Sequence, residues 1–179
     1  MIASRPLRGL VVGLCCVVLS ACATVSVEEY AGNEPKFIAE QFFAGRLVAH
    51  GIVKDRGGKV IRYFSAEIDA SWKDGVGTLD ERFVFDDGER QTRVWTLEPS
   101  GDNHYIATAG DVIGEGHMRV AGNSLFLDYV LRIPYNGDTL DLRIDDRMYL
   151  VSERVLLNES IMTKWGFEVG RIMLVISKT

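Results

Sequence analysis

Short runs of alternating apolar and polar residues fill the chain from residue 45 to residue 177. A period of two is typical of β-strands that bury one face. Turn-forming clusters such as DRGG, DDG, PSGDN, GN and YNGD separate several of these runs. The expected strands cover residues 45–54, 60–72, 77–85, 89–98, 103–109, 115–121, 124–133, 139–150, 153–164 and 168–177. Regular strands without a helical period predict an all-β domain, and we expect a closed or nearly closed antiparallel up-and-down β-barrel of eight to ten strands.

Three hairpins carry turns and side-chain patterns that predict how their strands pair. Asn136-Gly137 and Gly122-Asn123 form two-residue turns, whereas Asp86-Asp87-Gly88 forms a three-residue turn in which Gly88 takes a positive φ. With these turns, apolar residues oppose apolar residues and charges oppose opposite charges, as a correct register requires. The predicted pairs are Ile133–Leu140, Leu131–Leu142, Tyr129–Ile144, Arg132–Asp141, Val120–Leu125, Met118–Leu127 and His117–Asp128.

One face of these hairpins is strongly apolar and is expected to point into the barrel. Its members are the candidate walls of a ligand cavity. They are Phe83, Phe85, Trp95, Met118, Leu125, Leu127, Tyr129 and Ile144. A small barrel is equally able to fill its interior with its own side chains, so the pattern alone leaves a ligand cavity and a packed core open.

Three charged residues fall on the same apolar face. Glu81 and Arg93 lie opposite one another, and Asp146 lies opposite Leu127. Because buried charges are costly unless they are paired, we expect Glu81 and Arg93 to form an ion pair inside the fold and Asp146 to have a partner elsewhere. The ion pair either fixes the register or forms a polar anchor at the end of a ligand cavity.

The first residues are typical of a secretory signal peptide. Arg5 and Arg8 precede an uncharged apolar run over residues 10–19, which is half the length that a membrane-spanning helix needs. The following Leu-Ser-Ala-Cys over residues 19–22 resembles the lipobox of bacterial lipoproteins. That resemblance implies cleavage before Cys22 and acylation of its sulfur and new amine, so that acyl chains hold the domain on a membrane. The expected parts are a signal peptide (1–21), a lipidated tether (22–34) and one barrel domain (35–179).

The net charge and the residue after Cys22 indicate which partners and which membrane to expect. The chain has a formal net charge of −5, which becomes −7 once Arg5 and Arg8 are removed. An acidic domain is a poor binder of nucleic acid. Ala23 follows the lipid-bearing cysteine, where aspartate commonly retains enterobacterial lipoproteins at the inner membrane, so we expect the periplasmic face of the outer membrane of a Gram-negative bacterium.

Two further segments complete the pattern. Residues 35–43 (PKFIAEQFF) predict a short helical segment before the first strand. Residues 169–177 (VGRIMLVIS) are apolar on both faces, which is typical of a strand covered on both sides. We expect the helical segment to cover it, and the alternative is a patch that meets a partner or a membrane.

No motif in the chain predicts catalysis, a cofactor or a metal site. His50, His104 and His117 lie on separate segments and no cysteine is free to join them. There is no nucleophile elbow or phosphate loop, and the glycine-rich GDVIGEG over residues 110–116 is expected to be a loop or bulge. Glu81 and Asp146 form an acid/base pair only if they share an open pocket.

Several blocks carry a resemblance to a known family. LDERFVFDDGERQTRVW, AGDVIGEGHMRVAGNS and DDRMYLVSERVLLNESIMTKWG are similar to the blocks of a bacterial lipoprotein family known as domain of unknown function 3833. The strand succession also resembles lipocalin-like barrels. The family has no assigned activity, so the resemblance implies location and fold but no chemistry. Block residues in this chain include Glu81, Arg93, Asp111, Gly114, Asp146, Asn158 and Lys164.

Three functional hypotheses follow. The first is a non-catalytic lipoprotein that binds or carries a lipid, a fatty acyl chain or another apolar ligand in its barrel. The second is an envelope structural or assembly lipoprotein that acts through a protein partner, which a filled barrel with an exposed apolar patch near the last strand favours. The third is an enzyme acting on membrane lipid, with Glu81 and Asp146 as its acid/base pair.

Overall fold

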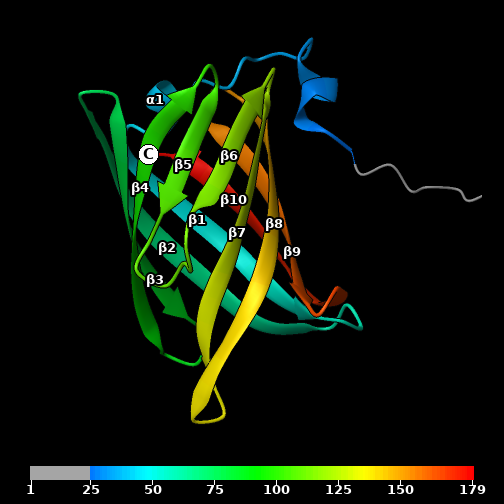
Figure 1. The fold of residues 1–179 in the computed structure, drawn as a ribbon. Coiled ribbons are helices and arrows are strands. Elements are labelled where there is room, and N and C mark those ends of the chain that lie inside the picture. Colours follow the sequence, from blue (N-terminus) through cyan, green and yellow to red (C-terminus); the bar gives the residue numbers. More distant parts are fainter. Residues whose placement is uncertain (1–24) are drawn as a thin grey trace, which may run out of the picture.

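The chain forms a closed antiparallel β-barrel of ten strands, as the computed structural model describes it for residues 25–179 (Figure 1). The expected signal peptide and Cys22 lie outside these residues. Each strand pairs with its sequence neighbours, and β10 closes the barrel by pairing with β1. The strands are β1 (Gly45–Asp55), β2 (Val60–Lys73), β3 (Val76–Phe85), β4 (Arg90–Gly101), β5 (His104–Thr108), β6 (Gly116–Ala121), β7 (Ser124–Tyr135), β8 (Asp138–Ser152), β9 (Val155–Lys164) and β10 (Phe167–Lys178). The all-β barrel prediction and all ten predicted strands are confirmed.

The predicted hairpin registers are also confirmed. Asn136 and Gly137 both have positive φ, which suits the two-residue turn between β7 and β8. Gly88 likewise has a positive φ, and Phe85 N–H donates to the Glu89 carbonyl across the three-residue turn. Every pair predicted above occurs, and so do Glu81–Arg93 and Leu127–Asp146.

The segment before β1 closes one end of the barrel. The short helix α1 (Ala39–Phe42) lies across the end that is uppermost in Figure 1. Phe37, Phe42 and Phe43 are buried there, with ring centroids 5.4–5.7 Å apart. The Trp72 indole N–H donates to the Phe43 carbonyl at 2.7 Å, so the plug is hydrogen-bonded to the wall as well as packed into it.

Part of the expected tether is ordered and packs on the outside of the barrel. Residues Val27–Tyr30 form the 3-10 turn η1, in which Val27 is buried. The Tyr30 ring contacts Phe126 and Tyr149 on the outer wall. Gly122 has a positive φ, and a Cβ there would lie 1.8 Å from the Tyr30 carbonyl oxygen. The β6–β7 turn therefore needs glycine for the N-terminal segment to approach so closely.

The prediction that residues 35–43 cover the last strand is wrong for the outer face of β10. Residues 35–43 enter the barrel end, where Lys178 Nζ donates to the Gln41 carbonyl at 2.6 Å. Outward-facing Met173 remains 43% exposed. The physical reason is that three phenylalanines bury more area inside the barrel end than on a flat outer wall.

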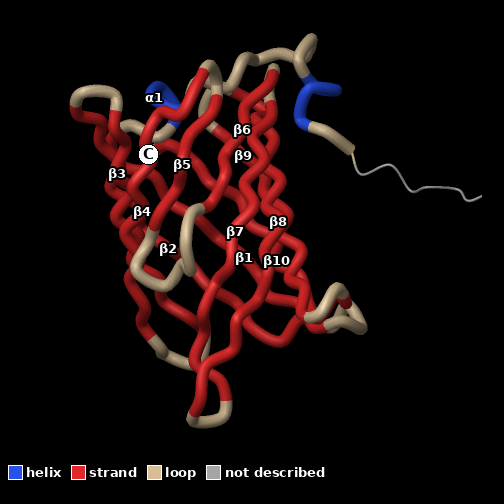
Figure 2. The backbone as a smooth tube through the Cα atoms, in the orientation of Figure 1, coloured by secondary structure: helices blue, strands red, loops and turns tan. Residues whose placement is uncertain are grey.

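Inward-facing side chains divide the barrel into two halves. In the upper half, nearest α1, most are buried, although Trp72, Val120 and Met148 stay partly exposed. The buried ones include Leu47, Ala49, Leu125, Leu150, Leu156 and Ile176. In the lower half, near the opposite end, many stay partly exposed: Val53, Phe83, Ile133, Leu140, Met162 and Leu174. Within residues 25–179, only hairpin turns lie at that lower end (Figure 2). The barrel is thus plugged at its upper end, whereas within residues 25–179 no such plug covers the partly exposed side chains at its lower end.

Candidate functional site

A small cavity in the upper half is lined by several of the predicted wall residues. Trp95, Met118, Leu125 and Leu127 surround a space of about 50 Å³, with Glu81 at its edge. Pockets that hold small organic ligands usually measure about 300–1,000 Å³. This cavity has room for water but not for an acyl chain. The upper half is therefore a packed core.

The other predicted wall residues lie lower in the barrel. Tyr129 and Ile144 are buried, and the Tyr129 ring packs edge-on against Trp95 with centroids 5.1 Å apart. Phe83 and Phe85 are only partly buried and stack at 6.3 Å in the lower half. The structure consequently brings only these two of the eight to the accessible part of the interior.

Arg93 is the centre of a charged cluster between the two halves. It donates Nε and Nη2 to the Asp111 carboxylate, at 3.0 and 2.8 Å. The Arg93 Nη1–Glu81 Oε2 distance is longer, at 3.9 Å. The predicted Glu81–Arg93 ion pair is present, but the bidentate partner of Arg93 is Asp111. Bidentate carboxylate pairing is the strongest arrangement available to a guanidinium group.

Asp111 reaches Arg93 because the β5–β6 loop folds against β7. Arg132 N–H donates to the Asp111 carbonyl at 2.8 Å, and Ile113 N–H donates to the Val130 carbonyl at 2.9 Å. An isolated bridge between Val112 and Leu131 completes the contact. The glycine-rich segment predicted as a loop is thus a loop that brings a partly exposed carboxylate into contact with Arg93.

Asp146 has the partner that its buried position requires. Only 6% of its surface is exposed, and Asn158 Nδ2 donates to its carboxylate at 3.2 Å. Ser160 in turn donates to the Asn158 carbonyl at 3.1 Å. Asn158 and Ser160 follow each other on the inward face of β9, opposite β8. The carboxylate is therefore enclosed by a polar network and is not open to a substrate.

Carboxylates outnumber cations in this cluster, and burial shifts their protonation. Burial raises the pKa of Glu81 to about 7 against the attraction of Arg93, and Asp146 and Asp111 raise it further. Burial also raises the pKa of Asp146, opposed by hydrogen bonding from Ser160, Asn158 and Tyr129. The floor of the accessible half thus repels an additional anion and favours neutral or donor groups.

The rim of the lower half is called the mouth. Two cationic side chains lie there. The guanidinium of Arg62 lies 3.6 Å from the centroid of the Phe85 ring and donates to Asp87 at 2.7 Å. Its Nε–H is buried and has no hydrogen-bond partner in the described part of the chain. Lys164 Nζ donates to the Asp141 carbonyl at 2.8 Å. Arg62 also pairs with Glu89, so two carboxylates balance its charge. Lys164 forms no ion pair within residues 25–179 and is the cation that the mouth offers to a ligand.

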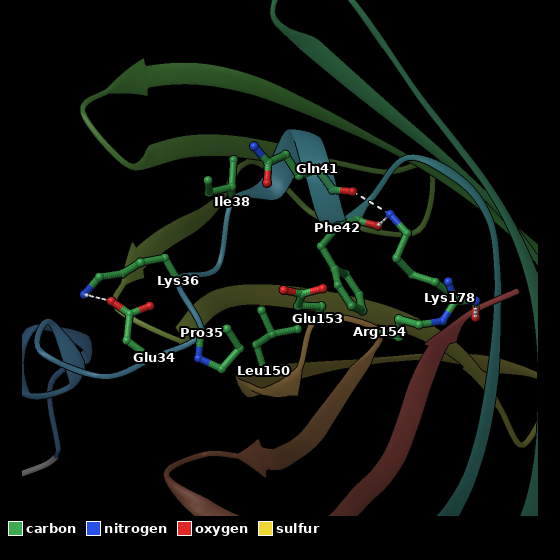
Figure 3. A pocket seen from close by; sticks show the side chains of 10 residues that line it. All are labelled: Glu34, Pro35, Lys36, Ile38, Gln41, Phe42, Leu150, Glu153, Arg154 and Lys178. Carbon is green, nitrogen blue, oxygen red and sulfur yellow. Dashed lines mark hydrogen bonds and ion pairs between the residues drawn. The ribbon is translucent and has the colours of Figure 1, made fainter.

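A larger polar groove lies outside the barrel, beside the plug (Figure 3). It measures about 630 Å³, and its cations already have partners. Lys36 pairs with Glu34 at 3.6 Å, Arg154 donates to the Lys178 carbonyl at 2.8 Å, and Lys178 holds the carbonyls of α1. These contacts attach the plug to the end of β10, so the groove has a structural role.

The described residues contain neither a cluster of metal-ligand side chains nor a helix suited to cross a membrane. Among residues 25–179, no three His, Cys, Asp or Glu side chains converge as metal ligands do. Asp128, which faces His117 across the sheet, accepts from Arg119 at 3.1 Å instead. No helix in this part of the chain has the length and apolarity to cross a membrane.

Comparison with known proteins gives a family and a fold. A family described as "Protein of unknown function (DUF3833)" matches residues 16–178. No curated protein matches the chain. Among solved structures, the S-type phycobiliprotein lyase CPES from Guillardia theta is similar, with a TM-score of 0.59 and 11% identity over 87% of this chain and 98% of that one. At that identity, the similarity establishes a common lipocalin-like barrel and leaves the chemistry open.

Proposed function

This chain belongs to the DUF3833 family, whose function is unknown, and from that premise we propose that it is a lipid-anchored periplasmic protein that binds an apolar ligand in the lower half of its barrel. The observation that carries the proposal is the contrast between the two halves. The upper half is plugged and packed, whereas apolar side chains that face inward in the lower half remain partly exposed. The shared fold with a phycobiliprotein lyase is compatible with this function.

The ligand that fits best is an acyl chain with its polar group at the mouth. Phe83, Ile133, Leu140 and Met162 offer apolar walls to such a chain. A carboxylate or phosphate at the mouth would meet the ammonium group of Lys164. The same anion deeper in the barrel would meet the carboxylates of the floor, so the charge distribution favours one orientation.

The proposed anchor would hold the barrel close to the outer membrane. Two residues, Ala23 and Thr24, separate Cys22 from Val25, the first described residue, and the three peptide links between Cys22 and Val25 span at most roughly 10 Å when extended. Because η1 is fixed to the outer wall next to β6–β8, acyl chains on Cys22 would lie near that wall. In this proposal, a short link and not a long tether connects the acylated Cys22 to the barrel.

Filling the lower half should abolish ligand binding. We expect the Cys22→Ser form, which cannot be acylated, to bind a fluorescent fatty acid. The additional change Leu140→Trp should weaken this binding by about tenfold or more, because the indole ring would occupy the space that the ligand needs. Val94→Trp adds the same side chain to the outer wall and should leave affinity unchanged. Fluorescence titration measures all three. Failure of the parent form to bind, or equal binding by Leu140→Trp, would contradict the proposal.

A further inference from the structure

Exposed apolar side chains gather on one sector of the outer wall and on the hairpin tip below it. The sector is formed by the neighbouring strands β2, β1, β10 and β9. At the tip, Trp165 is 87% exposed and Phe167 is 66% exposed. The exposed members are Ile61, Tyr63, Leu157, Trp165, Phe167, Val169 and Met173. An apolar sector of this kind marks a surface that contacts something other than water.

The backbone holds the aromatic tip away from the barrel. Trp165 and Gly166 have φ values of 51° and 82°, so they form a tight two-residue turn of the type that continues a twisted hairpin. The Lys164 ammonium lies 5.4 Å from the Trp165 ring and donates to the Asp141 carbonyl, which ties the base of the turn to β8. An indole at this position is presented outward by a rigid hairpin.

A basic turn lies beside the aromatic tip. β1 pairs with β10 as far as Asp55 opposite Gly170, so the β1–β2 turn and the β9–β10 turn are neighbours at the lower end (Figure 1). The first turn carries Lys54, Arg56 and Lys59. None of these three forms an ion pair within residues 25–179. Asp55 is the one carboxylate in this turn, so the turn has a positive excess in a chain with a net charge of −5. The β3–β4 turn at the same end is acidic, with Asp86, Asp87 and Glu89, so the cationic site is confined to the β1–β2 turn.

We propose that the lower end of the barrel docks on the surface of an anionic phospholipid bilayer. Trp165 and Phe167 enter the interface, where tryptophan is enriched in membrane proteins, and Lys54, Arg56 and Lys59 lie over the headgroup phosphates. The charge complementarity favours an anionic lipid surface over a neutral one. This docking is independent of the proposed ligand, because the barrel can dock whether or not a ligand is bound. It places the mouth of the barrel at the bilayer, where an acyl chain can enter.

Vesicle flotation tests this docking. The Cys22→Ser form floats with vesicles of phosphatidylcholine and phosphatidylglycerol. Its tryptophan emission shifts to shorter wavelength, and the shift is lost when Trp165 is replaced. The double variant Trp165→Ser/Phe167→Ser loses about tenfold or more of the binding, because the apolar area that enters the interface is removed. Arg56→Gln/Lys59→Gln loses the preference for anionic vesicles. Ile38→Ser/Val151→Ser, which changes exposed apolar side chains near the plugged end, leaves binding unchanged, and circular dichroism confirms that every variant is folded.

Three results overturn the docking. They are absence of flotation by the Cys22→Ser form, flotation that survives the loss of Trp165 and Phe167, and equal binding to pure phosphatidylcholine. The docking is also overturned if the Cys22→Ser form binds a protein through this tip but does not bind vesicles. A chain that floats but binds no fatty acid contradicts only the proposed ligand, so the two failures are distinguishable.

Discussion

We expect Arg93→Ala to lower the free energy of unfolding by about 3–5 kcal/mol, because removal of one partner leaves buried charge uncompensated. Arg93 makes the bidentate contact to Asp111 and faces Glu81 at 3.9 Å. Without the guanidinium, the buried carboxyl groups of Glu81 and Asp146 and the partly exposed carboxylate of Asp111 would have no cation among them. Chemical denaturation monitored by tryptophan fluorescence measures the loss.

A matched substitution on the outer wall separates burial from charge. Arg132 makes a similar two-bond contact to Asp141, at 2.7 and 2.9 Å, but the Arg132 side chain is 51% exposed whereas that of Arg93 is 17% exposed. Water screens such a pair, so Arg132→Ala should change stability far less than Arg93→Ala. Equal effects of the two substitutions would show that the interior cluster contributes no more than a surface ion pair.

We also expect Glu81 to make stability fall as the pH rises from about 4.5 to 7. The folded pKa of about 7 lies above the ordinary value of 4.5, so in this window the folded chain holds a proton that the unfolded chain releases. The contribution is complete below pH 4.5 and is lost as the pH passes 7. Its full size is about 3 kcal/mol. Glu81→Gln stays neutral and should lack this decline.

Denaturation curves at several pH values measure the difference between Glu81→Gln and the parent chain. The difference should move in favour of the variant as the pH rises from 5 to 8. Asp80→Asn removes a carboxylate that faces outward from the same strand and controls for the change in net charge. A difference that is flat with pH, or one that Asp80→Asn reproduces, would contradict a buried Glu81 with a raised pKa.

Much of the barrel is predictable because strand pairing obeys local rules. Alternation of side chains assigns each strand its inward face, and turns such as Asn136-Gly137 fix the register to a single residue. Once the register is known, the pairing of Glu81 with Arg93 follows without any three-dimensional information. The same reasoning identifies Asp146 as an inward-facing charge that needs a partner.

The remaining features depend on contacts between distant parts of the chain. Asp111 reaches Arg93 only because its loop forms backbone hydrogen bonds with β7, and no local pattern encodes that placement. Alternation likewise identifies Trp95 and Leu140 as inward-facing but does not tell which end of the barrel is plugged. The three phenylalanines of residues 37–43 decide which end is plugged, because they pack into the upper end and not into the lower one.

Mass spectrometry of extracted ligand tests most directly whether the lower half of the barrel is a binding site. The Cys22→Ser form is purified without detergent, extracted with organic solvent and compared with the same form carrying Leu140→Trp. An acyl lipid present in near-stoichiometric amount in the first preparation and absent from the second is the predicted result. A parent preparation free of lipid, or equal amounts in both, would contradict a ligand in the lower half.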